Sequence, residues 1–199
     1  MNNRFELLGL PCSGKSYYLK NCHATSGFST SCADFRSKRS RVLSVLLMMI
    51  KYYRVTFLCM VTFKYVSFKL WKCQFIGVFR YFSRIYDTSY PQQGISILEE
   101  GIMQSLWGLV FMMNHCDSSH VLARKIYQNI PKSSFSDVKY ISAPKQVILE
   151  RNSLREKKTR FSYFVDKNNI EIIDRSRIWM VFILKKLRDD EKVSIKFNS

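Results

Sequence analysis

The chain has 199 residues, of which 47% are hydrophobic and only 7 are glycine and 4 proline, so it is not a disordered chain and has enough apolar residues for one sizeable core. Its formal net charge of +17 favours anionic partners such as nucleotides, nucleic acid, phosphorylated glycans or acidic lipid headgroups, without selecting among them. The six cysteines form no Cys-x-x-Cys pair and no zinc-type spacing with histidine, and the first residues lack a basic head and apolar run, so we expect a reducing, cytosolic location.

The amino-terminal segment predicts a strand, a loop and a helix in that order. Residues 4–9 are mostly apolar and suit a short buried strand. A helix is expected to begin within residues 13–23, "SGKSYYLKNCH", after a glycine-containing turn. Residues 24–40 are rich in serine and threonine, and we expect mainly loop there.

Residues 35–86 contain eleven lysines and arginines and no acidic residue, and their first glycine is Gly77. This composition predicts two long antiparallel helices over 40–86, a basic helical pair with a bend near 62–66. The alternative is strands, which the β-branched and aromatic residues of the segment would also allow. Two apolar runs, 42–50 and 55–63, are each shorter than the ~18–20 residues needed to span a bilayer, and we expect them to be mostly buried. At 100° per residue, one helix face carries a basic stripe. The stripe consists of Lys69, Lys72, Arg80 and Arg84.

The second half of the chain alternates predicted strands and helices. The strands are expected over residues 94–101, 137–143, 169–174 and 192–197. The helices are expected over residues 102–114, 117–129, 144–152 and 175–187, with Pro144 in the first turn of the third. This order predicts an α/β fold with a mainly parallel sheet, formed by a single domain over residues 1–199.

The segment after the first strand fits the Walker A pattern G-x-x-x-x-G-K-[ST] at every fixed position. Its candidate nucleotide-binding residues are Gly9, Pro11, Cys12, Ser13, Gly14, Lys15 and Ser16. Successive backbone N–H groups of such a loop curl around phosphate oxygens, and the following helix adds its positive end. Lys15 would contact the β- and γ-phosphates and Ser16 would bind Mg²⁺, which predicts ATP and Mg²⁺ as ligands. The alternative is an ordinary strand-to-helix turn.

Two carboxylates, Glu99 and Glu100, end the predicted strand over 94–101. Ligands of a parallel α/β sheet gather at the carboxyl ends of its strands. Phosphoryl transfer needs a carboxylate near the γ-phosphate as a base or as a metal ligand. We assign the base and the Mg²⁺ ligand to Glu99, with Glu100 as a second candidate. The alternative is an acid pair that complements the dipole of the next helix.

A cluster of cations follows the helix over 144–152. The candidate catalytic residues are Arg151, Arg155 and Arg160, with Lys157 and Lys158 between them. Phosphoryl transfer develops negative charge on equatorial oxygens, and arginines on a mobile segment can neutralise it. We therefore predict a lid-like segment over 151–162. The alternative is a solvated helix end.

Together these segments resemble the P-loop kinases of the nucleoside and nucleotide kinase type. "GLPCSGKS" is similar to their phosphate loop. "YISAPKQVILERNSLREKK" is similar to their strand, proline and spaced arginines that lead into the lid. "IEIID" with the following Arg175 and Ser176 is similar to their "IDxS" stretch. More narrowly, "ILEEGIMQSLW" resembles the "ILDEGIxQ" segment of P-loop proteins that occur with surface-polysaccharide biosynthesis genes.

The resemblance implies a three-layer P-loop NTPase fold with a long helical insertion, and an ATP-dependent kinase activity toward a small-molecule or glycan-related acceptor. The chain also departs from the family. Glu99 stands where an aspartate is common in the family. The family's acceptor-binding triplet is expected after the second or third strand, whereas here its only match, Asp174-Arg175-Ser176, occurs later in the chain. A nucleoside acceptor is therefore disfavoured, and the acceptor stays open.

Two further interpretations of the basic helices compete with simple packing against the sheet. They could bind nucleic acid, as in a P-loop NTPase that acts on a polynucleotide, but no helicase-like second motif accompanies them. They could also lie on an anionic membrane surface, which would place a cytoplasmic enzyme peripherally on the inner membrane face.

Overall fold

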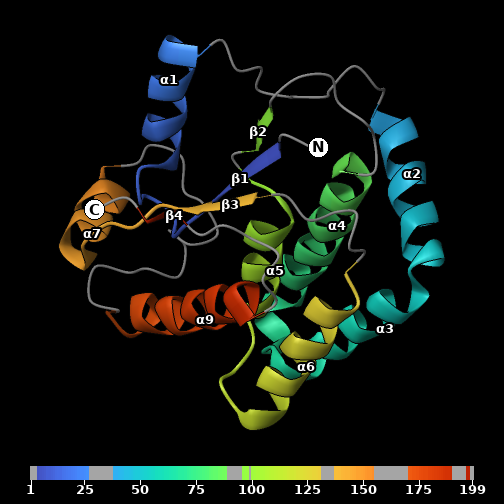
Figure 1. The fold of residues 1–199 in the computed structure, drawn as a ribbon. Coiled ribbons are helices and arrows are strands. Elements are labelled where there is room, and N and C mark those ends of the chain that lie inside the picture. The colour runs from blue at the N-terminus through green and yellow to red at the C-terminus, as the bar shows by residue number, and fades with distance from the viewer. Residues whose placement is uncertain are drawn as a thin grey trace. The chain divides into compact units, whose positions relative to one another are not determined.

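The structure is a computed structural model that describes residues 4–26, 38–88, 96–98, 100–130, 137–154, 170–189 and 196–197 (Figure 1). It is an α/β fold with a parallel sheet, as the order of predicted elements indicated. The chain divides into two compact units. The first unit comprises Met1–Thr30, Gly94–Gln104 and Ser136–Ser199, and the second comprises Ser31–Gln93 and Ser105–Phe135.

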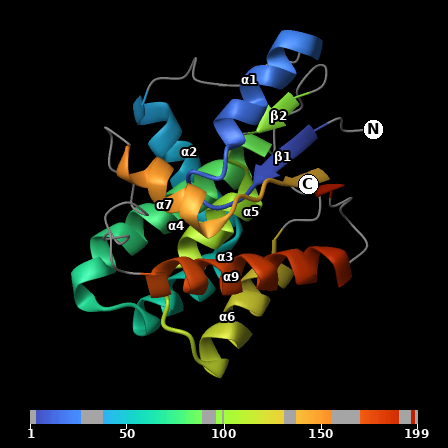
Figure 2. The ribbon, with the colours of Figure 1, turned by 90° about the vertical axis from the view of Figure 1, so that its left-hand side faces the viewer.

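The sheet belongs to the first unit and has the strand order β2-β1-β3-β4 (Figure 1). Figure 2 shows β2 beside β1, its partner. Every described strand pair is parallel. The strands are β1 (Arg4–Leu8), β2 (Ser96–Leu98), β3 (Asp137–Tyr140) and β4 (Lys196–Phe197). Since β1 is flanked on both sides by later strands, the loop at its carboxyl end lies where the strand order reverses, which is where open α/β sheets bind ligands.

The helices of the first unit include α1 (Lys15–Ser26), α7 (Lys145–Ser153) and α9 (Ile170–Asp189). The prediction of a strand over 169–174 was wrong, because residues 170–174 begin α9. Its buried side chains recur at helical spacing. They are Ile173, Ser176, Trp179, Met180, Ile183, Leu184 and Leu187. The amine of Lys145 forms an ion pair with Asp174, which holds the start of α7 against α9.

The second unit is helical. Its elements are α2 (Lys38–Lys51), α3 (Tyr53–Val61), the short 3-10 helices η1 (Thr62–Tyr65) and η2 (Phe68–Leu70), α4 (Trp71–Thr88) and α6 (Asp117–Gln128). Helix α5 (Ile102–Val110) begins in the first unit and continues in the second. Within the second unit α2 packs on α3 and α4, and α3 packs on α6.

The predicted helical pair is interrupted at two places. The expected bend near 62–66 is confirmed, since η1 ends at Tyr65 and the backbone of the next residue, Val66, is extended. A second break falls at Tyr52, where α2 and the segment formed by α3 and η1 meet at 96°. The hydroxyl of Thr56 donates to the carbonyl of Met49 over 2.6 Å and thereby satisfies a backbone group freed by this elbow.

The expectation that the two apolar runs are mostly buried was wrong. Val45 and Val55 are buried, but Leu43, Leu47 and Phe57 are 61%, 58% and 68% exposed. Among the described residues no single helix is long and apolar enough to cross a membrane, although the bent pair over 42–51 and 53–65 passes a test of length and composition.

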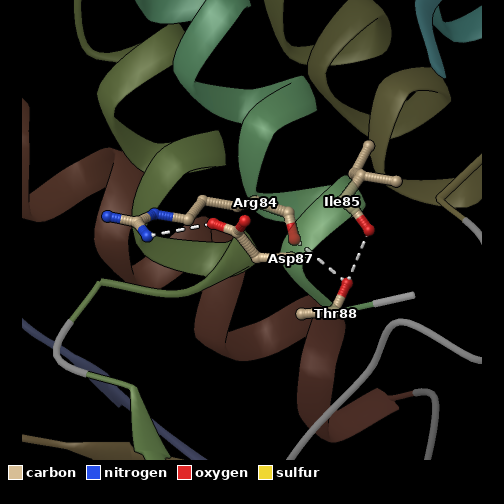
Figure 3. Close-up of polar contacts among 4 residues, drawn as sticks. All are labelled: Arg84, Ile85, Asp87 and Thr88. Carbon is tan, nitrogen blue, oxygen red and sulfur yellow. Dashed lines mark hydrogen bonds and ion pairs between the residues drawn. The ribbon is translucent and has the colours of Figure 1, made fainter. Parts of the chain in front are cut away.

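Helix α4 carries three residues of the predicted basic stripe, Lys72, Arg80 and Arg84, whereas Lys69 lies in η2. Core residues occupy the other side of α4. Lys72 and Arg80 are exposed, whereas Tyr81, Phe82 and Ile85 are fully buried. At its carboxyl end Arg84 pairs with Asp87 over 3.3 Å, and the Thr88 hydroxyl donates to the carbonyls of Arg84 and Ile85 (Figure 3). The Thr88 hydroxyl thus supplies an additional donor to carbonyls near the end of the helix.

The core of the second unit encloses two ionisable side chains in neutral form. Burial raises the pKa of the Cys59 thiol far above its ordinary value. Burial, and secondly the neighbouring Cys59, raise the pKa of Tyr81. Gln74 is also buried, and its amide donates to the Thr62 hydroxyl and to the Leu109 carbonyl.

Candidate functional site

The Walker A segment forms the turn between β1 and α1. Cys12 and Gly14 both have left-handed backbones, with φ values of +67° and +103°. The N–H of Ser13 donates to the Leu10 carbonyl over 3.1 Å, which closes the turn. Left-handed residues that alternate with right-handed ones can form concave loops of backbone N–H groups, and such loops bind anions.

The two glycines of the motif are needed for different reasons. A side chain at Gly9 would collide with the carbonyl of Ile141 and would lie 2.8 Å from the Ser13 hydroxyl. Gly9 therefore permits the close approach of the loop to the segment after β3. Gly14 permits the positive φ that ends the loop just before α1.

Lys15 and Ser16 occupy the first turn of α1. The Lys15 amine folds back across the loop and donates to the carbonyls of Gly9 over 2.6 Å and Leu10 over 3.2 Å. Ser16 is exposed. The Ser13 hydroxyl is buried and has no hydrogen-bond partner among the residues that the structure describes. The loop thus holds a cation and polar groups at one helix amino terminus.

A buried carboxylate connects β1 to the start of α5. Glu6 is 2% exposed, and its Oε1 accepts a 2.7 Å hydrogen bond from the backbone N–H of Gln104. The Gln104 side chain in turn accepts the N–H of Gly9 over 3.1 Å. Glu6 therefore caps α5, and Gln104 fixes the first residue of the loop. A side chain at Gly101 would overlap Glu6, its Cβ lying 2.6 Å from the Glu6 Cγ, so this position must be glycine.

Arg151 in α7 lies beside the loop. Its guanidinium donates to the carbonyl of Cys12 over 3.3 Å. The same group would lie 3.3 Å from a Cβ atom placed on Gly14. The Cys12 thiol faces the Asn152 side-chain oxygen at 4.0 Å. The carboxyl end of α7 therefore brings an exposed arginine to the loop, where an anion could bind both.

Of the remaining predicted site residues, only Glu100 lies within the described part of the chain. Glu100 follows β2 and is exposed. Glu99, Arg155 and Arg160 lie outside the described residues, as does most of the lid-like segment over 151–162. In the part of the chain that the structure describes, no three His, Cys, Asp or Glu side chains are grouped to hold a metal ion.

Sequence reasoning missed three residues around the loop: Glu6, Gln104 and Asn152. A signal existed for the first, because an acidic residue within an apolar strand such as "RFELL" must be hydrogen-bonded when buried. Gln104 stood in "GIMQ", whose match to the "ILDEGIxQ" segment included this glutamine. Nothing local distinguished Asn152 from other residues of the helix end.

Comparison with known proteins identifies no relative. No protein-family model, no curated protein sequence and no solved structure matches this chain. The functional argument therefore depends on the residues and geometry described above.

Proposed function

We propose that this chain is a kinase with a P-loop NTPase fold, which binds ATP at residues 9–16 and transfers its γ-phosphoryl group to a small-molecule or glycan-related acceptor. The observation that carries the proposal is the loop itself. It combines two left-handed residues, Cys12 and Gly14, with Lys15 at the start of a helix, at the carboxyl end of a central parallel strand. This combination suits a chain of phosphates.

In this proposal the loop N–H groups and Lys15 contact the β- and γ-phosphates. On nucleotide binding, the amine exchanges its bonds to the Gly9 and Leu10 carbonyls for phosphate oxygens. An acceptor hydroxyl attacks the γ-phosphorus, the bond to the oxygen bridging the β- and γ-phosphates breaks, and ADP leaves. The acceptor proton passes to a carboxylate after β2, assigned to Glu99 with Glu100 as the second candidate.

Ser16 and the same carboxylates would hold Mg²⁺, which would neutralise charge on the phosphates when bound. A hydroxyl and carboxylate oxygens are the ligands that this ion prefers. Arg151 already faces the loop at the Cys12 carbonyl, and it supports transfer by stabilising the charge on the γ-phosphoryl oxygens. An arginine poised there favours a transferase over a protein that only binds a nucleotide.

Nucleotide binding can be tested without knowledge of the acceptor. Cys12 is half-buried in the loop, whereas Cys116 is exposed outside it. We expect Mg²⁺-ADP to slow alkylation of Cys12 by N-ethylmaleimide, followed by peptide mass spectrometry, and to leave Cys116 unaffected. The Lys15→Ala variant should lose this protection, and Lys20→Ala, on the exposed side of the same helix, should keep it.

Transfer is tested separately. ATP turnover in the presence of sugar, sugar-phosphate or nucleoside acceptors should fall by about 10²-fold or more in Lys15→Ala. Equal alkylation of Cys12 with and without Mg²⁺-nucleotide would contradict the phosphate site. Protection without turnover on any acceptor would contradict only the transferase assignment.

A further inference from the structure

Exposed apolar side chains are concentrated on α2, α3, η2 and the first half of α4. Of the seventeen large hydrophobic side chains that are exposed among the described residues, twelve lie in this stretch. We call these twelve the α2–α4 surface. They are Val42, Leu43, Leu46, Leu47, Ile50, Tyr53, Phe57, Met60, Phe68, Trp71, Phe75 and Ile76. Soluble surfaces rarely concentrate so many large apolar groups, and such concentrations mark interaction sites.

The exposed residues follow the helical repeat. On α2 they occur at positions 42, 43, 46, 47 and 50, which fall within 140° of the helix circumference at 100° per residue. On α3 they occur at 53, 57 and 60, again on one side. The opposite sides bury Val45, Val55 and Cys59 in the unit's own core. Each helix therefore has a second apolar side that the described residues leave uncovered.

Cations interleave with this surface. The exposed positively charged side chains of this stretch are Lys51, Arg54, Lys64, Lys69, Lys72 and Arg80. No acidic residue occurs between residues 35 and 86 to balance them. A second copy of the same surface would bring like charges together, and exposed aliphatic side chains contribute nothing to a nucleic-acid backbone contact. An anionic surface with an apolar interior satisfies both kinds of side chain.

The aromatic residues fit such an interface. Trp71 is 44% exposed, and its indole N–H donates to the Val66 carbonyl. Phe68 is 79% exposed and its ring packs against Trp71 at 5.0 Å between centroids. Tryptophan concentrates at the boundary between lipid headgroups and acyl chains, and phenylalanine occurs with it on the lipid-facing side of interfacial helices.

We propose that the α2–α4 surface docks on the surface of an anionic phospholipid bilayer. Its apolar side chains enter the headgroup boundary while the six cations contact lipid phosphates. This inference is independent of the phosphate loop, since every residue in it belongs to the second unit.

The test is cosedimentation of the full chain with vesicles of phosphatidylcholine alone or mixed with phosphatidylglycerol. We expect binding to the anionic vesicles in about 0.1 M salt and much less in about 1 M salt, where the Debye length falls from ~10 to ~3 Å. Leu47→Glu and Phe57→Glu should each reduce binding about tenfold or more. Lys69→Gln with Lys72→Gln should reduce it by about fivefold per lysine.

Val181→Glu is the matched control, since Val181 is 62% exposed but lies on α9. It should bind as the unchanged chain does. Trp107 and Trp179 are buried, so a blue shift of the fluorescence on vesicle binding reports Trp71 and should vanish in Trp71→Phe. Circular dichroism of each variant verifies the fold.

Three results would overturn the inference. One is no sedimentation with anionic vesicles at low salt. Another is an equal loss of binding in Val181→Glu and Leu47→Glu. The third is a lipid-free dimer in analytical ultracentrifugation that Leu47→Glu dissociates, or a polynucleotide that displaces the vesicles, because either would assign the surface to a different partner.

Discussion

The backbone N–H of Gly9 donates to the side-chain oxygen of Gln104 over 3.1 Å, although 95 positions separate the two residues in the chain. Gln104 is itself fixed, because its own N–H donates to the buried Glu6. The first residue of the loop is thus held by α5 and by β1 together. Loop geometry consequently depends on residues outside the segment 9–16.

Gln104→Met should weaken nucleotide binding by about tenfold and lower the free energy of unfolding by about 1–3 kcal/mol, because the buried N–H of Gly9 loses its acceptor. Isothermal titration with Mg²⁺-ADP and urea unfolding measure the two effects. Binding that stays unchanged despite a loss of stability would show that the contact stabilises the fold without shaping the loop. Gln128→Met, at the exposed end of α6, is the control.

Gly101→Ala and Gly108→Ala should have opposite effects on stability. The Cβ at Gly101 would collide with the Glu6 side chain, whose carboxylate is held by the N–H of Gln104 and cannot move freely. At Gly108, within α5, nothing outside the adjacent residues and the backbone of the helix itself lies within 4 Å of the new Cβ. Alanine there should therefore stabilise the helix by roughly 0.5–1 kcal/mol. Thermal unfolding of the two variants compares them directly. Similar melting temperatures would contradict the packing of Gly101 on Glu6.

Arg151→Ala should slow ATP turnover by about 10²–10³-fold and change nucleotide affinity little, because the guanidinium is expected to act on charge that develops during transfer. Arg151→Lys should recover only part of the rate, since an ammonium lacks the planar fork. Arg188→Ala, in the exposed last turn of α9, should leave the rate unchanged. A larger KM at constant kcat in Arg151→Ala would reassign this arginine to ground-state binding.

Stability should fall at alkaline pH through the core of the second unit. The folded chain keeps Cys59 and Tyr81 neutral and raises the pKa of both groups. As pH rises above 9.0 and 10.0, their ordinary values, the unfolded chain loses these protons first, so stability present below pH 9.0 is progressively lost. Each group contributes a slope of up to about 1.4 kcal/mol per pH unit.

Urea unfolding between pH 8 and pH 11 measures this slope. Cys59→Ala with Tyr81→Phe should flatten it, and Cys73→Ala, which removes a half-buried thiol, should not. A slope that is the same in the double variant would mean that other groups control the alkaline transition.

The sequence predicted what depends on local pattern. The turn at 9–14 was located because its glycines, lysine and serine have fixed spacing, and the parallel strands followed from alternation of elements. The strand expected over 169–174 failed because three isoleucines resemble a strand when they are considered alone. Their continuation through Trp179 and Ile183 has the period of a helix, and that longer pattern determined the structure.

Long-range contacts were not predictable in the same way. Glu6 belongs to no recognisable local motif, and the match of Gln104 to the "ILDEGIxQ" segment does not reveal which residue it contacts. Their pairing requires the register of β1 on β2. The exposure of Leu43, Leu47 and Phe57 could not be predicted from the sequence either. An apolar run predicts that its side chains avoid water, but it does not indicate what they pack against.

The capping of α5 by Glu6 has a consequence for how the chain acquires its structure. Side chains alternate between the two faces of a strand, so a slip of β1 by one residue along β2 would turn Glu6 to the opposite face and leave the first turn of α5 without its acceptor. The Glu6 carboxylate thus favours one register of β1 on β2. Strand pairing, the start of α5 and the anchoring of Gly9 are expected to form as one cooperative step of folding.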